Sequence, residues 1–362
     1  MSKVLKVFLA GGGTGGHIYP ALSIAEALKK IEPTIQIEFV GTESGLETRI
    51  VPKAGYKLNL IQSGKLNFSG KLLEKIKTLI KIPIGLVQSV ILILKFKPDY
   101  VLGVGGYVSA PMLLAAALLG RRTAFWEPNA HPGMANRILS RWIDKSYLVF
   151  QDASRYLHSK KNLVFGMPLR AEMENLNQTK KKSDKFSILC FGGSQGSMFL
   201  NQKLSDFILN HPELQNQIEV VHQTGALDFE NMKQKYKNIH CVQVHDFIYN
   251  MPDYYQKADL LICRGGASTL AEAAAFGVVP IVIPLPAADD HQQKNAESLV
   301  QKKAGFMFVQ KNFNDDDFKK QMISLIQHPE QLEPMVVHLK ALAPQNASKA
   351  IAEDMLKEIK NI

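Results

Sequence analysis

Short apolar runs alternate with longer amphipathic stretches along most of the chain. The runs are rich in Val, Ile and Phe, and most of them have a continuous apolar stretch instead of a strict alternation with polar residues. They occupy residues 4–10, 36–41, 100–105, 123–127, 186–193, 218–225, 240–247, 259–266 and 279–285. Continuous apolar strands separated by helices are typical of parallel sheets covered on both faces. The pattern therefore predicts an α/β protein built from doubly wound parallel sheets.

A polar, charge-rich stretch at residues 175–185 (NLNQTKKKSDK) divides these strands into two series. The chain has 362 residues, which exceeds the roughly 250–300 at which a single core stops growing. Each series opens with a strand, a glycine-rich loop and a helix. We expect two similar domains, residues 1–170 and 171–344, with a C-terminal helix over about 345–362 that packs back on the first.

Four glycine-rich loops follow predicted strands: GGGTGGH (11–17), GVGGYVSAP (103–111), FGGSQGS (191–197) and CRGGASTLAE (263–272). Glycine between a strand end and a helix start lets backbone N–H groups and the helix dipole face an anion. The first loop satisfies G-x-G-x-x-G, but Glu43 lies a few residues late for the acid of a dinucleotide fingerprint. That loop alone could be such a fingerprint or an ordinary tight turn. Four such loops together indicate a site for a sugar diphosphate.

Two side chains beside these loops are candidates for specific chemistry. His17 follows the glycines at a helix start, where it could act as a base, donate to an oxyanion or be an ordinary helix-start residue. Glu272 could accept hydrogen bonds from ribose hydroxyls. Alternatively, it could complete a capping box in the first turn of a helix capped by Ser268 or Thr269.

Arginines and neutral amides supply further candidate contacts. Arg170 and Arg264 could bind phosphate or base, since guanidinium matches phosphate oxygens bidentately. Gln292, Gln293 and Asn295 offer neutral donors and acceptors, which suit sugar hydroxyls better than phosphates.

Several signatures are missing from the sequence. Cys190, Cys241 and Cys263 lie far apart, which suggests neither a disulfide framework nor a zinc site and fits a reducing compartment. There is no H-E-x-x-H metal-binding motif. Asp315 and Asp317 lie in a polar segment that we interpret as a helix start. We therefore expect no protein-held metal and no cofactor.

The chain carries a net positive charge and contains one basic, apolar tract. The net charge of +10 favours phosphate-rich partners and leaves anionic membrane, nucleic acid and nucleotide open. Lys65 to Lys97 contains seven Lys and one Glu, and residues 82–94 are too short for the ~20 residues of a membrane span. The tract predicts a basic helix on an anionic membrane surface, or a core helix with solvated lysines, which we favour for residues 90–94. The predicted membrane contacts are Leu72, Leu73, Ile76, Leu79, Ile80 and Ile84.

The motifs of the chain also carry a family resemblance. They are GGTGGH (12–17), GVGGYVSAP (103–111), EPN (127–129), GGSQG (192–196), R-x-G-A-x-T-x-x-E (264–272) and DHQQKNA (290–296). In this order and spacing the chain resembles the MurG family of peptidoglycan glycosyltransferases. That family adds N-acetylglucosamine to undecaprenyl-diphospho-N-acetylmuramoyl pentapeptide (lipid I), which makes lipid II. The resemblance covers nearly the whole chain.

The resemblance implies a GT-B fold of two Rossmann-like domains and a peripheral enzyme on the cytoplasmic face of the plasma (inner) membrane. UDP-N-acetylglucosamine would bind mainly to the C-terminal domain and the lipid-linked acceptor to the N-terminal one. Nucleic acid would not be a partner, and a cell-wall synthesis complex could be. The family inverts the anomeric carbon without a covalent intermediate, so a base deprotonates the C4 hydroxyl of the muramoyl sugar as UDP leaves. His17 is the candidate for that base.

Further roles follow from the resemblance at matching positions. Ile248 would meet the uracil through its backbone and Glu272 would take the ribose hydroxyls. The acceptor side would include Gly105, Gly106 and Tyr107. The implied donor contacts are Thr14, Gly15, Gly16, His17, Asn129, Arg170, Ser194, Ile248, Arg264, Ala267, Ser268, Thr269, Glu272, Gln292, Gln293 and Asn295.

Two departures and three alternatives accompany the resemblance. Pro128 and Met167 stand where the family usually has Gln and Asn, close to the contacts expected of Asn129 and Arg170. One alternative is another GT-B enzyme on UDP-N-acetylglucosamine, such as a 2-epimerase or a glycolipid synthase. The first loop alone would also fit a nicotinamide-dependent dehydrogenase. A basic lipid- or nucleic-acid-binding module would explain the charge but not four loops at strand ends.

Overall fold

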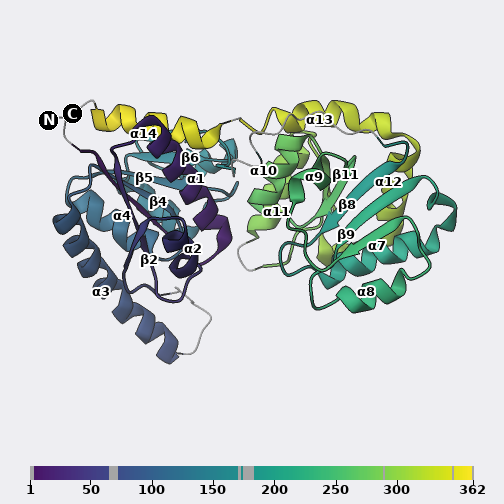
Figure 1. The fold of residues 1–362 in the computed structure, drawn as a ribbon, viewed down its shortest axis with the longest axis horizontal. Coiled ribbons are helices and arrows are strands. Elements are labelled where there is room, and N and C mark those ends of the chain that lie inside the picture. Colours follow the sequence, from purple (N-terminus) through teal and green to yellow (C-terminus); the bar gives the residue numbers. More distant parts are fainter. Residues whose placement is uncertain are drawn as a thin grey trace. The chain divides into compact units, whose positions relative to one another are not determined.

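The computed structural model describes residues 4–64, 72–169, 173, 183–287, 290–344 and 346–360, without the side chains of residues 72–80. The chain divides into two compact units (Figure 1). Unit 1 comprises Met1–Ala171 and Asn346–Ile362, and unit 2 comprises Glu172–Gln345. Each unit is described by itself.

Unit 1 is built on a parallel sheet of seven strands in the order β3-β2-β1-β4-β5-β6-β7 (Figure 1). Its strand order reverses between β1 and β4, and ligands of such sheets bind at the carboxyl ends beside this switch point. The strands are β1 (Lys6–Gly11), β2 (Gln36–Gly41), β3 (Lys57–Leu60), β4 (Tyr100–Gly105), β5 (Arg122–Glu127), β6 (Lys145–Leu148) and β7 (Lys161–Val164). The helices are α1 (Gly15–Ile31), α2 (Glu47–Lys53), α3 (Leu72–Phe96), α4 (Ser109–Leu118), α5 (Met134–Leu139) and α14 (Ala347–Lys360).

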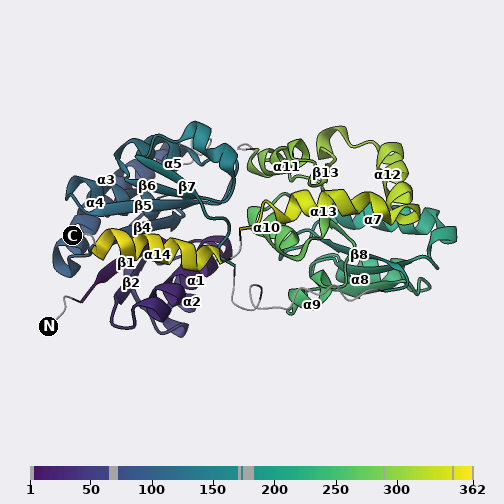
Figure 2. The ribbon, with the colours of Figure 1, turned by 90° about the horizontal axis from the view of Figure 1, so that it is seen from above.

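The C-terminal helix α14 belongs to unit 1, although it follows unit 2 in the sequence. It packs beside α1 (Figure 2) and buries an apolar face that includes Ile351 and Met355. Asp354 accepts hydrogen bonds from the Lys145 amine at 2.7 Å and the Tyr147 hydroxyl at 2.8 Å, both on β6. These contacts hold α14 against the sheet of unit 1.

Unit 2 repeats the architecture with a parallel sheet of six strands in the order β10-β9-β8-β11-β12-β13. Its switch point lies between β8 and β11. The strands are β8 (Phe186–Phe191), β9 (Ile218–Gln223), β10 (Val242–His245), β11 (Leu260–Cys263), β12 (Val279–Val282) and β13 (Phe306–Met307). The helices are α7 (Met198–Asn210), α8 (Phe229–Lys235), α9 (Met251–Tyr255), α10 (Ala267–Phe276), α11 (His291–Gln301), α12 (Asp315–Gln327) and α13 (Leu332–Lys340).

The two doubly wound parallel sheets predicted from the sequence are confirmed. The structure adds strands β3, β6, β7 and β13, which the apolar pattern did not indicate. The helix start predicted at Asp315 and Asp317 is also confirmed, with Asn314 as its capping residue.

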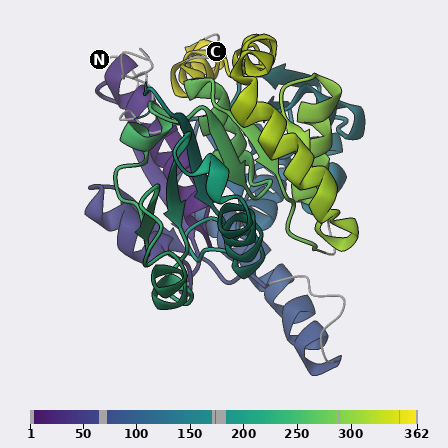
Figure 3. The same ribbon diagram turned by 90° about the vertical axis from the view of Figure 1, so that its right-hand side faces the viewer.

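Helix α3 extends beyond the sheet of unit 1 at its first turns (Figure 3). Of the predicted membrane contacts, the side chains of Leu72, Leu73, Ile76, Leu79 and Ile80 lie outside the described residues. The preference for a core position at residues 90–94 holds for Ile93, which is fully buried, but it is wrong for Ile91 and Leu94, which are 58% and 54% exposed. Within the described residues, no helix has the length and apolar character needed to cross a membrane.

Candidate functional site

Two glycine loops meet at the switch point of unit 1. The N–H of Gly12, after β1, donates to the carbonyl of Gly105, the last residue of β4, at 3.4 Å. Gly106 has a φ of +78°, and a Cβ there would lie 2.6 Å from the Gly12 carbonyl oxygen. Only glycine allows this approach, so the residues predicted for the donor side and the acceptor side are brought together here.

A buried carboxylate that the sequence analysis missed lies under the first loop. Glu47, at the start of α2, is 0% exposed, and its two oxygens accept hydrogen bonds from the N–H of Gly13 at 2.8 Å and of Thr42 at 2.9 Å. Its Oε1 also accepts from the Thr42 hydroxyl at 3.0 Å. Glu43, which was considered as the acid of a dinucleotide fingerprint, is exposed, and it is Glu47 that binds the loop. Because the Gly13 N–H donates to a carboxylate, it is not available to a phosphate.

The imidazole of His17 lies against the second loop. A Cβ on Gly105 would overlap the ring, so the absence of a side chain there makes room for it. The Nδ1 atom is buried without a hydrogen bond. Burial lowers the pKa of His17 below 6.5, while the backbone of Val104 and the charge of Glu47 act in the opposite direction. The imidazole is therefore neutral at pH 7 and able to accept a proton.

The N-terminus of α1 is open to a ligand. Thr14 occupies the capping position, but its side chain makes no capping hydrogen bond, while its carbonyl accepts from His17 N at 3.1 Å. Gly15 and Gly16 begin the helix, so their N–H groups have no intrahelical acceptor. This end of the helix could stabilise a negative charge.

Asn129 is held by a second buried carboxylate, Glu127, at the end of β5. Glu127 is 2% exposed and accepts hydrogen bonds from Asn129 N and Nδ2, Gly133 N and Asn136 Nδ2. Burial raises the pKa of Glu127, and these hydrogen bonds partly oppose the rise. Pro128 lies inside this turn, and the peptide N–H that follows it, that of Asn129, donates to Glu127.

Ser109, within the second loop, joins two strands of the sheet. Ser109 Oγ accepts from Gly105 N at 3.0 Å and donates to the Ala10 carbonyl at 2.7 Å. Tyr107 lies between Gly105 and Ser109 in the chain. It is 50% exposed and faces solvent at this edge of the sheet. The backbone around Gly105 and Tyr107 is therefore bound to β1 as well as to β4.

In unit 2, Gln223 joins the loop after β8 to the loop after β10. Its Nε2 donates to the Gly193 carbonyl at 2.9 Å, and its Oε1 accepts from Ile248 N at 3.1 Å. The side chain is 3% exposed. Gln223 thus fixes the loop that carries the exposed Ser194 relative to the backbone of Ile248. Both residues were predicted as nucleotide contacts. No local pattern indicates Gln223, because its partners lie 30 and 25 residues away in the chain.

A buried polar network supports the same region. His222 Nε2 pairs with Asn201 Oδ1 at 3.0 Å, and Asn201 Nδ2 donates to the Thr224 carbonyl and to Asp228. Since the Asn201 oxygen can only accept, His222 Nε2 carries the proton and Nδ1 accepts from the Tyr236 hydroxyl at 3.2 Å. Burial lowers the pKa of His222 to about 4.

Arg264 is bound mostly by the protein itself. Its Nη1 donates to the carbonyls of Ile283 and Pro284 and to Gln310 Oε1, and its Nη2 donates to Ser197 Oγ at 2.7 Å. The residue is 8% exposed, and burial lowers its pKa. The guanidinium therefore braces the loops around the switch point of unit 2, and its predicted phosphate contact remains a prediction.

Two of the three predicted sugar-reading amides hold the loop after β11. Gln292 Oε1 accepts from Gly265 N and Leu285 N, both at 3.0 Å, and Asn295 Nδ2 donates to the Gly265 carbonyl at 3.1 Å. The third, Gln293, donates to Glu297 at 2.9 Å.

Glu272 lies further along α10 than the sequence analysis expected. The helix begins at Ala267 after Gly266, with no side-chain cap, so Ser268 and Thr269 lie inside the first turn and do not cap it. Glu272 is therefore in the second turn, and the capping-box alternative is wrong. Its carboxylate accepts from the Tyr255 hydroxyl at 3.2 Å. The first-turn N–H groups of α10 have no intrahelical acceptor.

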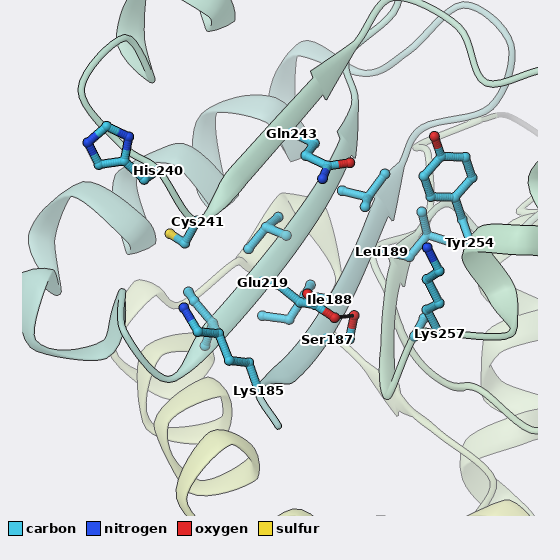
Figure 4. Close-up of a pocket in the computed structure, with 14 residues that line it drawn as sticks. Lys185, Ser187, Ile188, Leu189, Glu219, His240, Cys241, Gln243, Tyr254 and Lys257 are labelled. Carbon is cyan, nitrogen blue, oxygen red and sulfur yellow. Dashed lines mark hydrogen bonds between the residues drawn. The ribbon is translucent and has the colours of Figure 1, made fainter. Parts of the chain in front are cut away.

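The remaining predicted residues fall outside these clusters. Arg170 lies outside the described residues, and Met167, just before it, is 6% exposed. In the part of the chain that the structure describes, no three His, Cys, Asp or Glu side chains lie together so as to hold a metal ion. A polar cavity of about 260 Å³ lies at the amino ends of β8 and β9, where Ser187 Oγ donates to Glu219 at 2.9 Å (Figure 4). None of the predicted site residues lines it.

Comparison with protein families matches both units. Residues 7–148 match the glycosyltransferase family 28 N-terminal domain, and residues 187–354 match the glycosyltransferase family 28 C-terminal domain.

Comparison with curated proteins finds relatives over the full length. A protein of Bdellovibrio bacteriovorus is 50% identical over 358 residues, which cover 99% of this chain and 100% of that one. A protein of Citrifermentans bemidjiense is 38% identical, covering 98% of this chain and 100% of that one. Both are named UDP-N-acetylglucosamine–N-acetylmuramyl-(pentapeptide) pyrophosphoryl-undecaprenol N-acetylglucosamine transferase.

Solved structures show the same architecture. MurG of Acinetobacter baumannii is 28% identical, with a TM-score of 0.80, 98% of this chain covered and 99% of that one. A UDP-GlcNAc 2-epimerase from Neisseria meningitidis has a TM-score of 0.67 at 16% identity, covering 98% of this chain and 100% of that one, and it shares the fold alone.

Proposed function

Since the chain belongs to glycosyltransferase family 28, we propose that it transfers N-acetylglucosamine from UDP-N-acetylglucosamine to the C4 hydroxyl of the N-acetylmuramoyl sugar of lipid I, forming lipid II. The observation that carries this proposal is the 50% identity over 99% of the chain to a relative named for that transfer. The loops at the carboxyl ends of both sheets agree with it, because they offer backbone N–H groups to a nucleotide sugar.

Unit 2 is proposed to hold the donor. The uracil and ribose would meet the Ile248 backbone and Glu272, and the diphosphate would meet the first-turn N–H groups of α10, which no side chain caps. Gln223 and Gln292 would act indirectly, because they fix the backbone that makes these contacts. Gln293, on the same helix as Gln292, would bind the sugar hydroxyls.

Unit 1 is proposed to hold the acceptor and the base. The C4 hydroxyl oxygen of the muramoyl sugar attacks C1 of N-acetylglucosamine, its proton passes to His17, and the bond from C1 to the diphosphate oxygen breaks with its electron pair on UDP. Attack from the face opposite to UDP inverts C1. The lowered pKa of His17 keeps the imidazole unprotonated and ready for this role.

Membrane association of unit 1 is part of the proposal. Ile84, Val87, Ile91 and Leu94 on α3 are 39%, 59%, 58% and 54% exposed. Their spacing of three and four residues places them on one face of the helix. Lys81, Lys95 and Lys97 lie at the two ends of this stretch. An apolar stripe with basic residues at its ends would lie on the anionic, cytoplasmic surface of the membrane that holds the lipid-linked acceptor.

The proposal is tested by UDP release from UDP-N-acetylglucosamine with and without a lipid I analogue. We expect release that requires the acceptor, and a His17→Gln variant that loses about 10²–10⁴-fold in kcat with little change in the donor KM. No release by the wild type, or release without an acceptor, would overturn the proposal.

A further inference from the structure

We propose that Glu47 is a positioning residue of the transfer reaction, which fixes the first glycine loop and with it the placement of His17. This inference rests on the function proposed above and extends it to a residue outside the glycine motifs. It starts from a carboxylate that is fully buried beneath the loop.

The buried carboxylate of Glu47 is satisfied by hydrogen bonds. Among the described residues no Lys or Arg pairs with it, and its partners are two backbone N–H groups and the Thr42 hydroxyl, at 2.8–3.0 Å. A buried carboxylate costs free energy unless it is hydrogen-bonded, and bonds to an ionised acceptor are the strong ones. A carboxylate that accepts three such bonds fixes the two chain segments that donate them, residues 12–14 and 41–43.

Three glycines make room for this side chain. A Cβ at Gly12, Gly41 or Gly45 would overlap the carboxyl group or the carbon that carries it. Gly12 belongs to the first loop, Gly41 ends β2, and Gly45 precedes α2. Glycine at three positions around one carboxylate indicates that the loop and Glu47 form one structural unit.

Glu47 acts on His17 in two ways. Gly13, which donates to Glu47, is followed by Thr14, whose carbonyl accepts from the N–H of His17. The negative charge of Glu47 also raises the proton affinity of an imidazole whose pKa burial lowers. The ring also meets Gly105 and the backbone of Val104, which carry no charge. Among the described residues, Glu47 is thus the charged group that acts on His17.

The test is Glu47→Gln, which keeps the size of the side chain and removes its charge. We expect kcat to fall about tenfold or more because His17 becomes a weaker base, with the donor KM unchanged within about twofold. The acidic limb of the kcat–pH profile should move to lower pH. The matched control is Glu38→Gln on β2, whose carboxylate binds Lys57 and Asn59 away from the loop and whose loss should change neither quantity.

A second measurement does not depend on activity. NMR titration of the His17 imidazole should give a lower pKa in Glu47→Gln than in the wild type, whatever reaction the protein catalyses. If Glu47→Gln does not fold, Thr42→Val removes one hydrogen bond and keeps the charge. That variant should lower kcat severalfold and leave the pKa of His17 unchanged.

Two outcomes would overturn the inference. One is an unchanged kcat and an unchanged His17 pKa in Glu47→Gln. The other is a lower kcat with an unchanged pH profile and His17 pKa, because Glu47 would then be structural only. Absence of transfer by the wild type would instead overturn the proposed function, and the NMR comparison would still decide whether Glu47 acts on His17.

Discussion

Gln292 binds the backbone of Gly265 through its side-chain oxygen, which accepts the Gly265 N–H at 3.0 Å. The same oxygen accepts the N–H of Leu285 at 3.0 Å. One amide on α11 therefore joins the loop after β11 to the loop after β12. This makes Gln292 part of the frame of the proposed donor site, whether or not it also touches the sugar.

Replacing Gln292 with Leu should weaken donor binding by loosening both loops. Two hydrogen bonds are lost, each worth about 0.5–1.5 kcal/mol, so the KM for UDP-N-acetylglucosamine should rise about tenfold. The matched control is Gln301→Leu, at the exposed end of the same helix, which should leave the KM unchanged. An unchanged KM in Gln292→Leu would show that the loops hold their shape without it.

Replacing Glu272 with Ala should raise the UDP dissociation constant at least tenfold, because hydrogen bonds from hydroxyls to a carboxylate are worth about 1.5–3 kcal/mol. Isothermal titration with UDP and with 2′-deoxy-UDP identifies the partner. The wild type should prefer UDP, and Glu272→Ala should bind both ligands equally. Tyr255→Phe removes only the hydroxyl that donates to Glu272 and should keep the preference. A preference that survives in Glu272→Ala would reject the ribose role.

Replacing Ile84, Val87, Ile91 and Leu94 together with Ser should release the protein from anionic vesicles. These side chains are at least 39% exposed, so the change should leave the core intact while it removes the apolar surface that would enter the membrane. We expect the partition coefficient in a sedimentation assay to fall more than tenfold. Val337→Ser, at a position of unit 2 that is 68% exposed, is the control. Equal sedimentation of both variants would contradict the proposed membrane surface.

Unit 2 should lose stability in acid through His222. Its pKa is lowered from 6.5 to about 4, so the folded state excludes a proton that the unfolded chain binds. The contribution of the neutral imidazole to the free energy of unfolding is complete above pH 6.5. It is lost as the pH falls toward 4, by about 3 kcal/mol in total. Urea unfolding between pH 7 and pH 4 should show this slope in the wild type and a smaller slope in His222→Gln. An unchanged slope in His222→Gln would contradict the assignment.

The apolar runs predicted the strands that are buried on both faces. They missed the strands whose residue types do not match their burial in the fold. Strand β6 begins with Lys145, a charged residue that does not indicate a buried strand. Its amine is nevertheless buried, because it pairs with Asp354, which lies 209 residues later in the chain. Strands β3 and β7 are partly exposed edge strands, and β13 has only two residues, so none of them forms a continuous apolar run.

The glycine loops could be predicted because glycine is required by local geometry, whereas the residues that hold them could not. Glu47 lies 34 residues from Gly13, and Gln223 lies 30 from Gly193. Their function depends on which strands become neighbours in the sheet, and no local spacing encodes that. The ribose role of Glu272 stays a prediction, and the first-turn position expected for it was wrong, since the helix starts at Ala267 without a side-chain cap.

The central claim is an inverting transfer of N-acetylglucosamine to the C4 hydroxyl of the muramoyl sugar. The most direct test is NMR analysis of the disaccharide released from the product of wild-type protein, UDP-N-acetylglucosamine and a lipid I analogue. We predict one N-acetylglucosamine in β linkage to C4 of N-acetylmuramic acid. An α linkage, a linkage to another hydroxyl, or conversion of the donor to its 2-epimer without transfer would contradict the claim.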